Sequence, residues 1–158
     1  MMKRIACAAA VLALATPALA QNARGEAKAT VAGKAVSIDY GRPSLKGRDM
    51  LGQAQVGQAW RMGADAATTL KTDADLAFGA VNVPKGEYTL TATKVSVDAW
   101  QLNVLGKDRA KVADVPLTSG KAAAAAEQFT IDLTGEGSKG ALKLTWGTTT
   151  LQAAFTGK

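Results

Sequence analysis

Three arginines, a lysine and a tryptophan concentrate in two short stretches of this sequence, residues 42–48 (RPSLKGR) and 60–62 (WRM), in a chain otherwise rich in small and aliphatic residues. Their arginines carry a permanent positive charge, and guanidinium groups bind carboxylates and phosphates through paired hydrogen bonds. Trp60 adds an apolar ring against which a ligand can stack. The two stretches predict a site for a small anionic or saccharide-like ligand, or for an acidic segment of a partner such as an envelope protein. The candidate ligand-binding residues are Arg42, Ser44, Lys46, Arg48, Trp60, Arg61 and Asp65.

The same arginines also allow a purely structural interpretation. Asp39, Asp49 and Asp65 lie close to them in the sequence and could form ion pairs with them. Such pairs, with Trp60 as an anchor, would hold a long loop against a sheet without any ligand. The two interpretations differ in whether the arginines are exposed, which the sequence does not determine.

Enzymatic alternatives are limited by the residue types that the sequence lacks. It has no histidine, and its only cysteine is Cys7. With Cys7 in a segment expected to be removed, Cys/His zinc sites, Ser-His-Asp triads and Cys-His dyads are excluded from the mature chain. A hydrolase of cell-envelope material that uses Asp65 or another carboxylate stays open, as does a structural envelope module with no small-molecule site. We favour a binding function and predict no catalytic residue, metal or cofactor.

Two further patterns carry weaker hypotheses. Ser44 and Lys46 resemble a Ser/Lys nucleophile pair, but no oxyanion hole is evident beside them. Asp73 and Asp75 carry oxygen ligands suited to calcium, although two carboxylates before a strand are more typical of a solvated turn.

The first twenty residues have the pattern of a secretory signal. Lys3 and Arg4 precede an uncharged apolar run, and residues 18–20 (ALA) match the small-x-small cleavage pattern. The run is shorter than the roughly 20 apolar residues of a membrane-spanning helix, and no later segment replaces it. We therefore expect cleavage after Ala20 and a periplasmic or secreted mature protein without a transmembrane segment.

Charge gives little support for a nucleic-acid partner. Removal of the signal leaves 17 basic residues against 13 acidic ones. This balance favours anionic surfaces only weakly, and aromatic residues do not alternate with the basic ones as they do on a base-stacking surface. We expect no nucleic-acid partner.

The elements that must position the candidate site are predicted to be strands. Apolar residues recur at every second position from Val36 onward, which is the pattern of a half-buried strand. Turn residues separate these runs, at residues 84–86 (PKG) and 135–140 (GEGSKG), and Gly147 predicts either a tight turn or a bulge. The inward positions are Val36/Ile38/Tyr40, Tyr88/Leu90/Ala92, Trp100/Leu102/Val104, Phe129/Ile131/Leu133, Leu142/Leu144/Trp146 and Leu151/Ala153/Phe155.

This pattern predicts an all-β, single-domain antiparallel β-sandwich, with partial closure into a barrel as a variant. We expect a flexible N-terminal segment at residues 21–34 and the domain itself at residues 35–158. Residues 47–60 could hold one short helix, around residues 50–54. The five alanines of residues 122–126 have helix propensity but are too few for a stable helix, and are expected to form a connector or a single helical turn.

An ordered set of motifs supports the same conclusion. YGRPSLKGR (residues 40–48), WRMGADAATTL (60–70), NVPKGEYTL (82–90) and the closing FTIDL and LKLTWGTTTLQAAFT resemble a bacterial family catalogued as domain of unknown function 2911. The resemblance runs from about Val36 to Phe155. It implies an exported single-domain β protein with no established activity.

Two positions depart from the family pattern. Asp65 occupies a position that is commonly asparagine, and Gln55-Val56 stands where a Pro-Tyr pair is frequent. The carboxylate would alter an anion-binding role of this loop. The absent tyrosine removes an aromatic wall that a sugar site would use.

Overall fold

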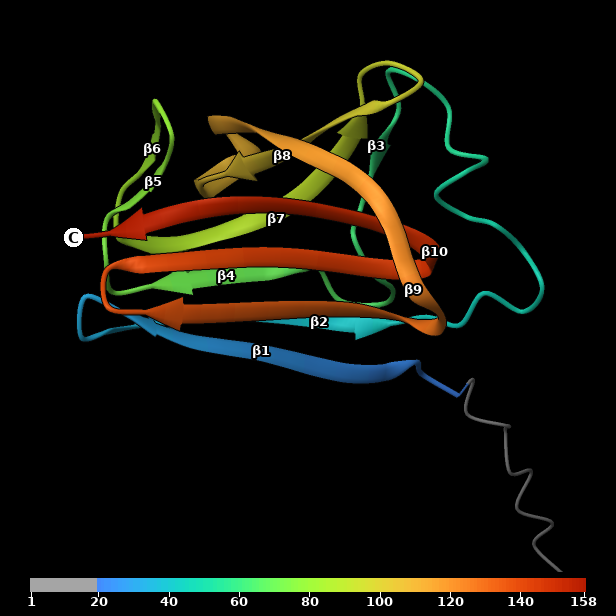
Figure 1. Cartoon of the computed structure of the whole chain (residues 1–158), viewed down its shortest axis with the longest axis horizontal. Helices are drawn as coiled ribbons and strands as arrows, with labels where there is room; N and C mark the ends of the chain where they lie inside the picture. The colour runs from blue at the N-terminus through green and yellow to red at the C-terminus, as the bar shows by residue number, and fades with distance from the viewer. Residues whose placement is uncertain (1–19) are drawn as a thin grey trace, which may run out of the picture.

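The computed structural model describes residues 20–158, so the predicted signal segment lies outside the described residues except for Ala20. Strands make up most of this range, and the predicted all-β antiparallel fold class is confirmed (Figure 1). The elements are β1 (Ala23–Val31), β2 (Lys34–Arg42), β3 (Ala59–Trp60), β4 (Thr69–Thr72), β5 (Leu76–Phe78), β6 (Val81–Val83), β7 (Gly86–Lys94), β8 (Ala99–Leu105), a 3-10 turn η1 (Lys107–Arg109), β9 (Lys111–Glu136) and β10 (Lys139–Gly157).

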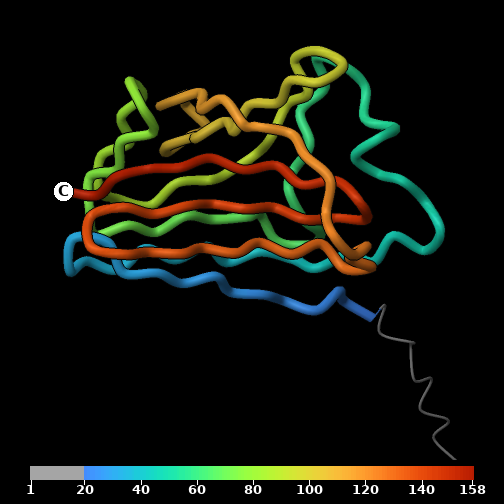
Figure 2. The backbone as a smooth tube through the Cα atoms, in the orientation of Figure 1, coloured from blue at the N-terminus to red at the C-terminus, as the bar shows by residue number. Residues whose placement is uncertain are grey.

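One continuous antiparallel sheet supplies both layers of the sandwich. Its strand order is β1-β2-β4-β7-β8-β9-β10-β5-β6, and β3 pairs with β7 beside this path. β9 belongs to both layers, because residues 111–118 pair with β8 and residues 118–136 pair with β10. Figure 1 shows β9 arching from one layer to the other, and the tube in Figure 2 follows the same bend. The sheet therefore folds over on itself around a shared core.

The bend in β9 corrects one expectation and confirms another. The five alanines of residues 122–126 form neither a connector nor a helical turn, since they lie within β9. Ala126 pairs with Gly147 of β10, where the register shifts on both sides and Gly147 has a φ of 61°. This is the predicted bulge, and bulges bend and twist a strand. Pairing with β10 thus overrides the helix propensity of alanine.

One more expectation is wrong, and the single short helix that residues 47–60 could hold is not formed. Residues 21–34 are not a flexible segment, because β1 pairs with β2 from Ala23 to Val31. Residues 47–60 contain a series of turns that leads into β3 and no helix, and Asp49 Oδ1 accepts a hydrogen bond from the Gly52 nitrogen (3.0 Å) within these turns. The one turn of 3-10 helix in the described range is η1, between β8 and β9.

The core fills the space between the two layers. Nearly all the alternating apolar residues that the sequence places on inward positions are buried, and Trp100 and Trp146 are core residues as predicted, each 4% exposed. Tyr40 connects the layers because its hydroxyl oxygen accepts a hydrogen bond from the Ile131 nitrogen of β9 (3.0 Å). Between Ala20 and Lys158 no helix is long and apolar enough to cross a membrane.

Candidate functional site

Arg42 is used to hold the two layers together. Its Nε donates a hydrogen bond to the Phe129 carbonyl oxygen and its Nη2 donates one to Thr130 Oγ1, both at 3.3 Å. The side chain is half-buried, and both partners lie on β9. Arg42 therefore fits the structural interpretation of the arginine cluster.

The residues after Arg42 continue along β9 as an added stretch of strand. The Phe129 nitrogen donates to the Pro43 carbonyl oxygen (2.9 Å), and the Leu45 nitrogen donates to the Glu127 carbonyl oxygen (2.9 Å). Ser44 forms a β-bridge with Gln128 between these two bonds. Ser44 is thus placed by backbone pairing, and its position gives no further support to a Ser/Lys nucleophile.

Lys46 and Arg48 follow on the exposed surface. The Lys46 nitrogen donates to Glu127 Oε1 (3.0 Å), and Lys46 has a positive φ of 51°. The Arg48 nitrogen donates to the Leu45 carbonyl oxygen (3.1 Å), which closes a turn. Both side chains are exposed.

Arg61 and Asp65 belong to the turn that follows β3. The Arg61 guanidinium donates a hydrogen bond to the Asp65 carbonyl oxygen. The Asp65 carboxylate accepts hydrogen bonds through Oδ2 from the Asn22 backbone nitrogen (2.9 Å) and from Asn22 Nδ2 (3.3 Å). Asp65 therefore fastens the start of the described chain to this turn, and its carboxylate is engaged there rather than with an arginine.

The ion pairs suggested for the arginine cluster do not form. Asp39 pairs with Arg24 of β1, and Asp49 caps the Gly52 turn. Among the ion pairs of residues 20–158, none includes Arg42, Arg48 or Arg61. The structural role of Arg42 and Arg61 depends on hydrogen bonds to oxygen atoms of the backbone and of a threonine.

Two of the seven candidates, Arg48 and Trp60, line the same groove. We call it the loop groove, and its volume is about 410 Å³. Its chemically distinctive lining residues are Arg48, Met50, Gln53, Gln55, Gln58 and Trp60.

Trp60 is held at the base of the loop groove by an aromatic cluster. Its ring stacks on Trp146 with centroids 5.7 Å apart, and meets Phe129 and Trp100 edge to face at 4.9 and 6.4 Å. β3 fixes its backbone through the pairing of Trp60 with Ala92 of β7. Because Trp60 is only half-buried, it both anchors the loop in the core and offers apolar surface to the groove.

The rest of the loop groove was missed from the sequence. Met50 and the glutamines at 53, 55 and 58 carry no charge and lie outside any strand pattern, yet they supply half of the lining residues. Three glutamines within six residues were the available signal. Arg48 is the one charged residue of the lining, so the groove combines one guanidinium, three carboxamides and an apolar base.

Metal ligation finds no support in the described range. No group of three or more Asp, Glu, Cys or His residues is placed to hold an ion within residues 20–158. Asp75 Oδ1 instead accepts a hydrogen bond from the Lys85 nitrogen (2.8 Å), which is the turn role suggested by the sequence.

Comparison with known proteins assigns the family. A family model described as a protein of unknown function (DUF2911) matches residues 22–155. The chain belongs to this family. The match begins at Asn22, the residue that binds Asp65, and it includes β1, so this strand is part of the family's domain. No curated protein matches the chain, and no solved structure matches it either.

Proposed function

We propose that this protein is an exported binding domain whose loop groove holds a small anionic ligand. The observation that carries the proposal is the meeting of Arg48, Trp60 and three glutamines in one groove of about 410 Å³. Ligand sites are typically concave, largely apolar and supplied with a few polar groups that fix orientation. The loop groove has this composition.

The chemistry of the lining indicates which ligand would fit. Arg48 can bind a carboxylate or phosphate through two parallel hydrogen bonds. Each glutamine carboxamide both donates and accepts hydrogen bonds, which suits amide or hydroxyl groups of the ligand. Met50 and Trp60 pack against an apolar portion. An acylated amino acid or short peptide with a free carboxylate has all three parts.

The groove favours binding over hydrolysis because it contains no carboxylate. General acid-base catalysis near neutral pH in a chain without histidine needs a positioned carboxylate or lysine. Asp65 lies outside the lining, and its Oδ2 is hydrogen-bonded to Asn22. The envelope hydrolase that would use Asp65 is therefore the weaker alternative.

The loop that forms the groove is fixed at both ends. The Leu45 nitrogen is bonded to the Glu127 carbonyl oxygen of β9, and the Gly57 nitrogen is bonded to the Lys94 carbonyl oxygen at the end of β7 (2.8 Å). A groove whose walls are already ordered loses less conformational entropy when a ligand binds.

Binding is expected to depend on Arg48 and not on the neighbouring lysine. Isothermal titration of N-acetyl-alanyl-alanine and its C-terminal amide, with phosphate as a third probe, would compare wild type with Arg48→Gln and Lys46→Gln. Each variant removes one exposed cation from the same loop, but only Arg48 lines the groove. A hydrogen bond to a charged group contributes about 1.5–3 kcal/mol, so Arg48→Gln should weaken carboxylate binding roughly 10-fold or more.

The outcomes separate a groove site from general attraction between charges. Lys46→Gln should bind within about twofold of wild type, and the amidated dipeptide should bind as weakly to wild type as the free acid does to Arg48→Gln. Equal losses in both variants would show nonspecific attraction and contradict the groove. No binding of any of the three probes would contradict this ligand class.

Export rests on residues 1–20 and is tested separately. If the signal segment is cleaved after Ala20, the protein recovered from the periplasm or culture medium begins at Gln21, two residues before β1. Intact-mass measurement of that fraction is expected to show the loss of residues 1–20. A full-length chain that stays in the cytoplasm would contradict export without affecting the groove.

A further inference from the structure

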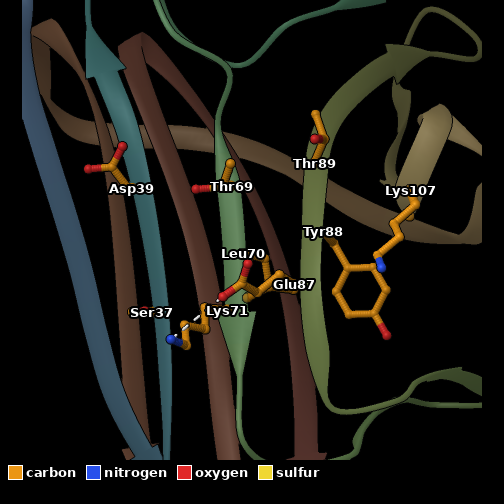
Figure 3. A pocket seen from close by; sticks show the side chains of 10 residues that line it. Ser37, Asp39, Thr69, Leu70, Lys71, Glu87, Tyr88, Thr89 and Lys107 are labelled. Atoms are coloured by element: carbon orange, nitrogen blue, oxygen red, sulfur yellow. Dashed lines mark ion pairs between the residues drawn. The ribbon is translucent and has the colours of Figure 1, made fainter.

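A second hollow lies on the outer face of the sheet, away from the core. Its volume is about 470 Å³, and β2, β4 and β7 form its floor (Figure 3). The polar side chains of this floor are Ser37, Asp39, Thr69, Lys71, Glu87 and Thr89. We call it the outer-face hollow, and it shares no residue with the loop groove.

Strand register arranges these side chains as a regular grid. Asp39 pairs with Thr69, which pairs with Thr89, and this makes one row across the three strands. Ser37, Lys71 and Glu87 make the next row on the same face. Neighbouring strands are about 4.8 Å apart and alternate residues about 7 Å apart, so the grid measures roughly 10 by 7 Å. That area suits about one hexose ring, with a hydroxyl or charged group below each edge of the ring.

Most charges of the grid are balanced within the protein. Lys71 Nζ lies 3.5 Å from Glu87 Oε1, and Asp39 pairs with Arg24. Lys107 also lines the hollow, and no acidic side chain of residues 20–158 forms an ion pair with it. The outer-face hollow therefore presents hydroxyls and paired charges, with one ammonium group left for a ligand.

Tyr88 and η1 form the wall of the hollow on the β8 side. Figure 3 shows the Tyr88 ring beside the Lys107 side chain. The Tyr88 hydroxyl donates to the Pro84 carbonyl oxygen (2.6 Å), which fixes the ring. Partial burial, with a smaller contribution from Asp75, raises the pKa of the Tyr88 hydroxyl above its usual value. An uncharged ring is suited to packing against the C–H groups of a sugar.

We propose that the outer-face hollow binds an acidic sugar, with the ring hydroxyls on the Thr69 and Thr89 grid and the carboxylate on Lys107. Carboxylates and hydroxyls that are partly paired within the protein retain lone pairs that accept hydrogen bonds from sugar hydroxyls. The Lys107 ammonium distinguishes an acidic sugar from its neutral counterpart. The site is independent of the loop groove and does not need the proposed function to hold.

Titration of the ¹⁵N-labelled protein with sodium glucuronate, and with glucose as the neutral comparison, tests the assignment by NMR. Saturable shifts are expected at amides of β2, β4 and β7, with glucuronate bound more tightly than glucose. Thr69→Val keeps the shape of the side chain, and valine is also a good strand former. The variant should weaken the binding of both sugars about threefold or more, because the hydrogen bond from the Thr69 hydroxyl is lost. Lys107→Gln should remove the preference for glucuronate, a change of up to about fivefold for an exposed charge pair.

Matched variants make each result decisive. Lys143→Gln removes an exposed lysine from β10 in the other layer and should change neither affinity. Arg48→Gln should leave the glucuronate titration of the β2, β4 and β7 amides unchanged, whereas any carboxylate held by the loop groove would shift amides of residues 48–60 instead. Absence of saturable shifts, shifts confined to residues 48–60, or a glucuronate preference that survives Lys107→Gln would each overturn the proposal.

Discussion

Replacing Phe129 with alanine is expected to lower the free energy of unfolding by about 3–5 kcal/mol. Phe129 lies on β9, is 0% exposed, and its ring meets Tyr40 at 5.6 Å, Trp60 at 4.9 Å and Trp146 at 5.7 Å. It therefore touches aromatic residues from β2, β3 and β10 at once. Removing the ring leaves a cavity where the two layers meet Trp60. The close packing of the core allows the surrounding side chains to fill little of it.

Urea unfolding followed by tryptophan fluorescence measures this loss. Val97→Ala is the control, because Val97 is 78% exposed in the β7–β8 turn and its loss should change stability by no more than about 0.5 kcal/mol. A loss below about 1 kcal/mol for Phe129→Ala would mean that the aromatic cluster is not the junction of the two layers. Since Phe129 packs on Trp60, the variant should also weaken the binding of any ligand in the loop groove.

Gly41→Ala is expected to cost about 3 kcal/mol for a different reason. A Cβ on Gly41 would lie 2.8 Å from the Ala64 nitrogen and closer still to its carbonyl oxygen. Both are backbone atoms, so the turn after β3 would have to move away from β2, and overpacking of this kind costs about 1–3 kcal/mol or more. The displaced turn carries Arg61 and Asp65, so their contacts should weaken as well.

Gly33→Asn is the matched control for this substitution. Gly33 has a φ of 73° in the turn between β1 and β2, and a Cβ at this position would meet no other atom within 4 Å. Asparagine tolerates this conformation, so the variant should lose no more than about 1 kcal/mol in thermal or urea unfolding. Equal losses in the two variants would show that the contact between Gly41 and Ala64 is not the constraint.

The RPSLKGR motif divides into two parts with different roles. Its first part, Arg42 to Leu45, is fastened to β9 by hydrogen bonds, and Gly41 just before it allows the close approach of the 61–65 turn. Its last residue, Arg48, is exposed and lines the loop groove. The structural interpretation therefore holds for Arg42, and the ligand-binding interpretation is our proposal for Arg48.

Much of the fold was readable from the sequence because strand alternation is a local property. Side chains on a strand point to opposite faces in turn, so the apolar positions from Val36 to Phe155 identify six strand segments and their buried faces without knowledge of the partners. The inward tryptophans Trp100 and Trp146 followed from the same pattern. The bulge at Gly147 was one of the two alternatives that the glycine itself offered.

The tertiary structure decided which of the candidate residues meet. Arg42 binds residues 87 and 88 positions further along the chain, and Asp65 binds one 43 positions before it. Such contacts depend on the order and register of paired strands, which the alternating pattern leaves open. For the same reason, the alternating pattern did not place residues 122–126 in β9, where Ala126 pairs with Gly147 of β10. Nor did it place the glutamines of the loop groove, whose loop is held at its ends by hydrogen bonds to β9 and β7.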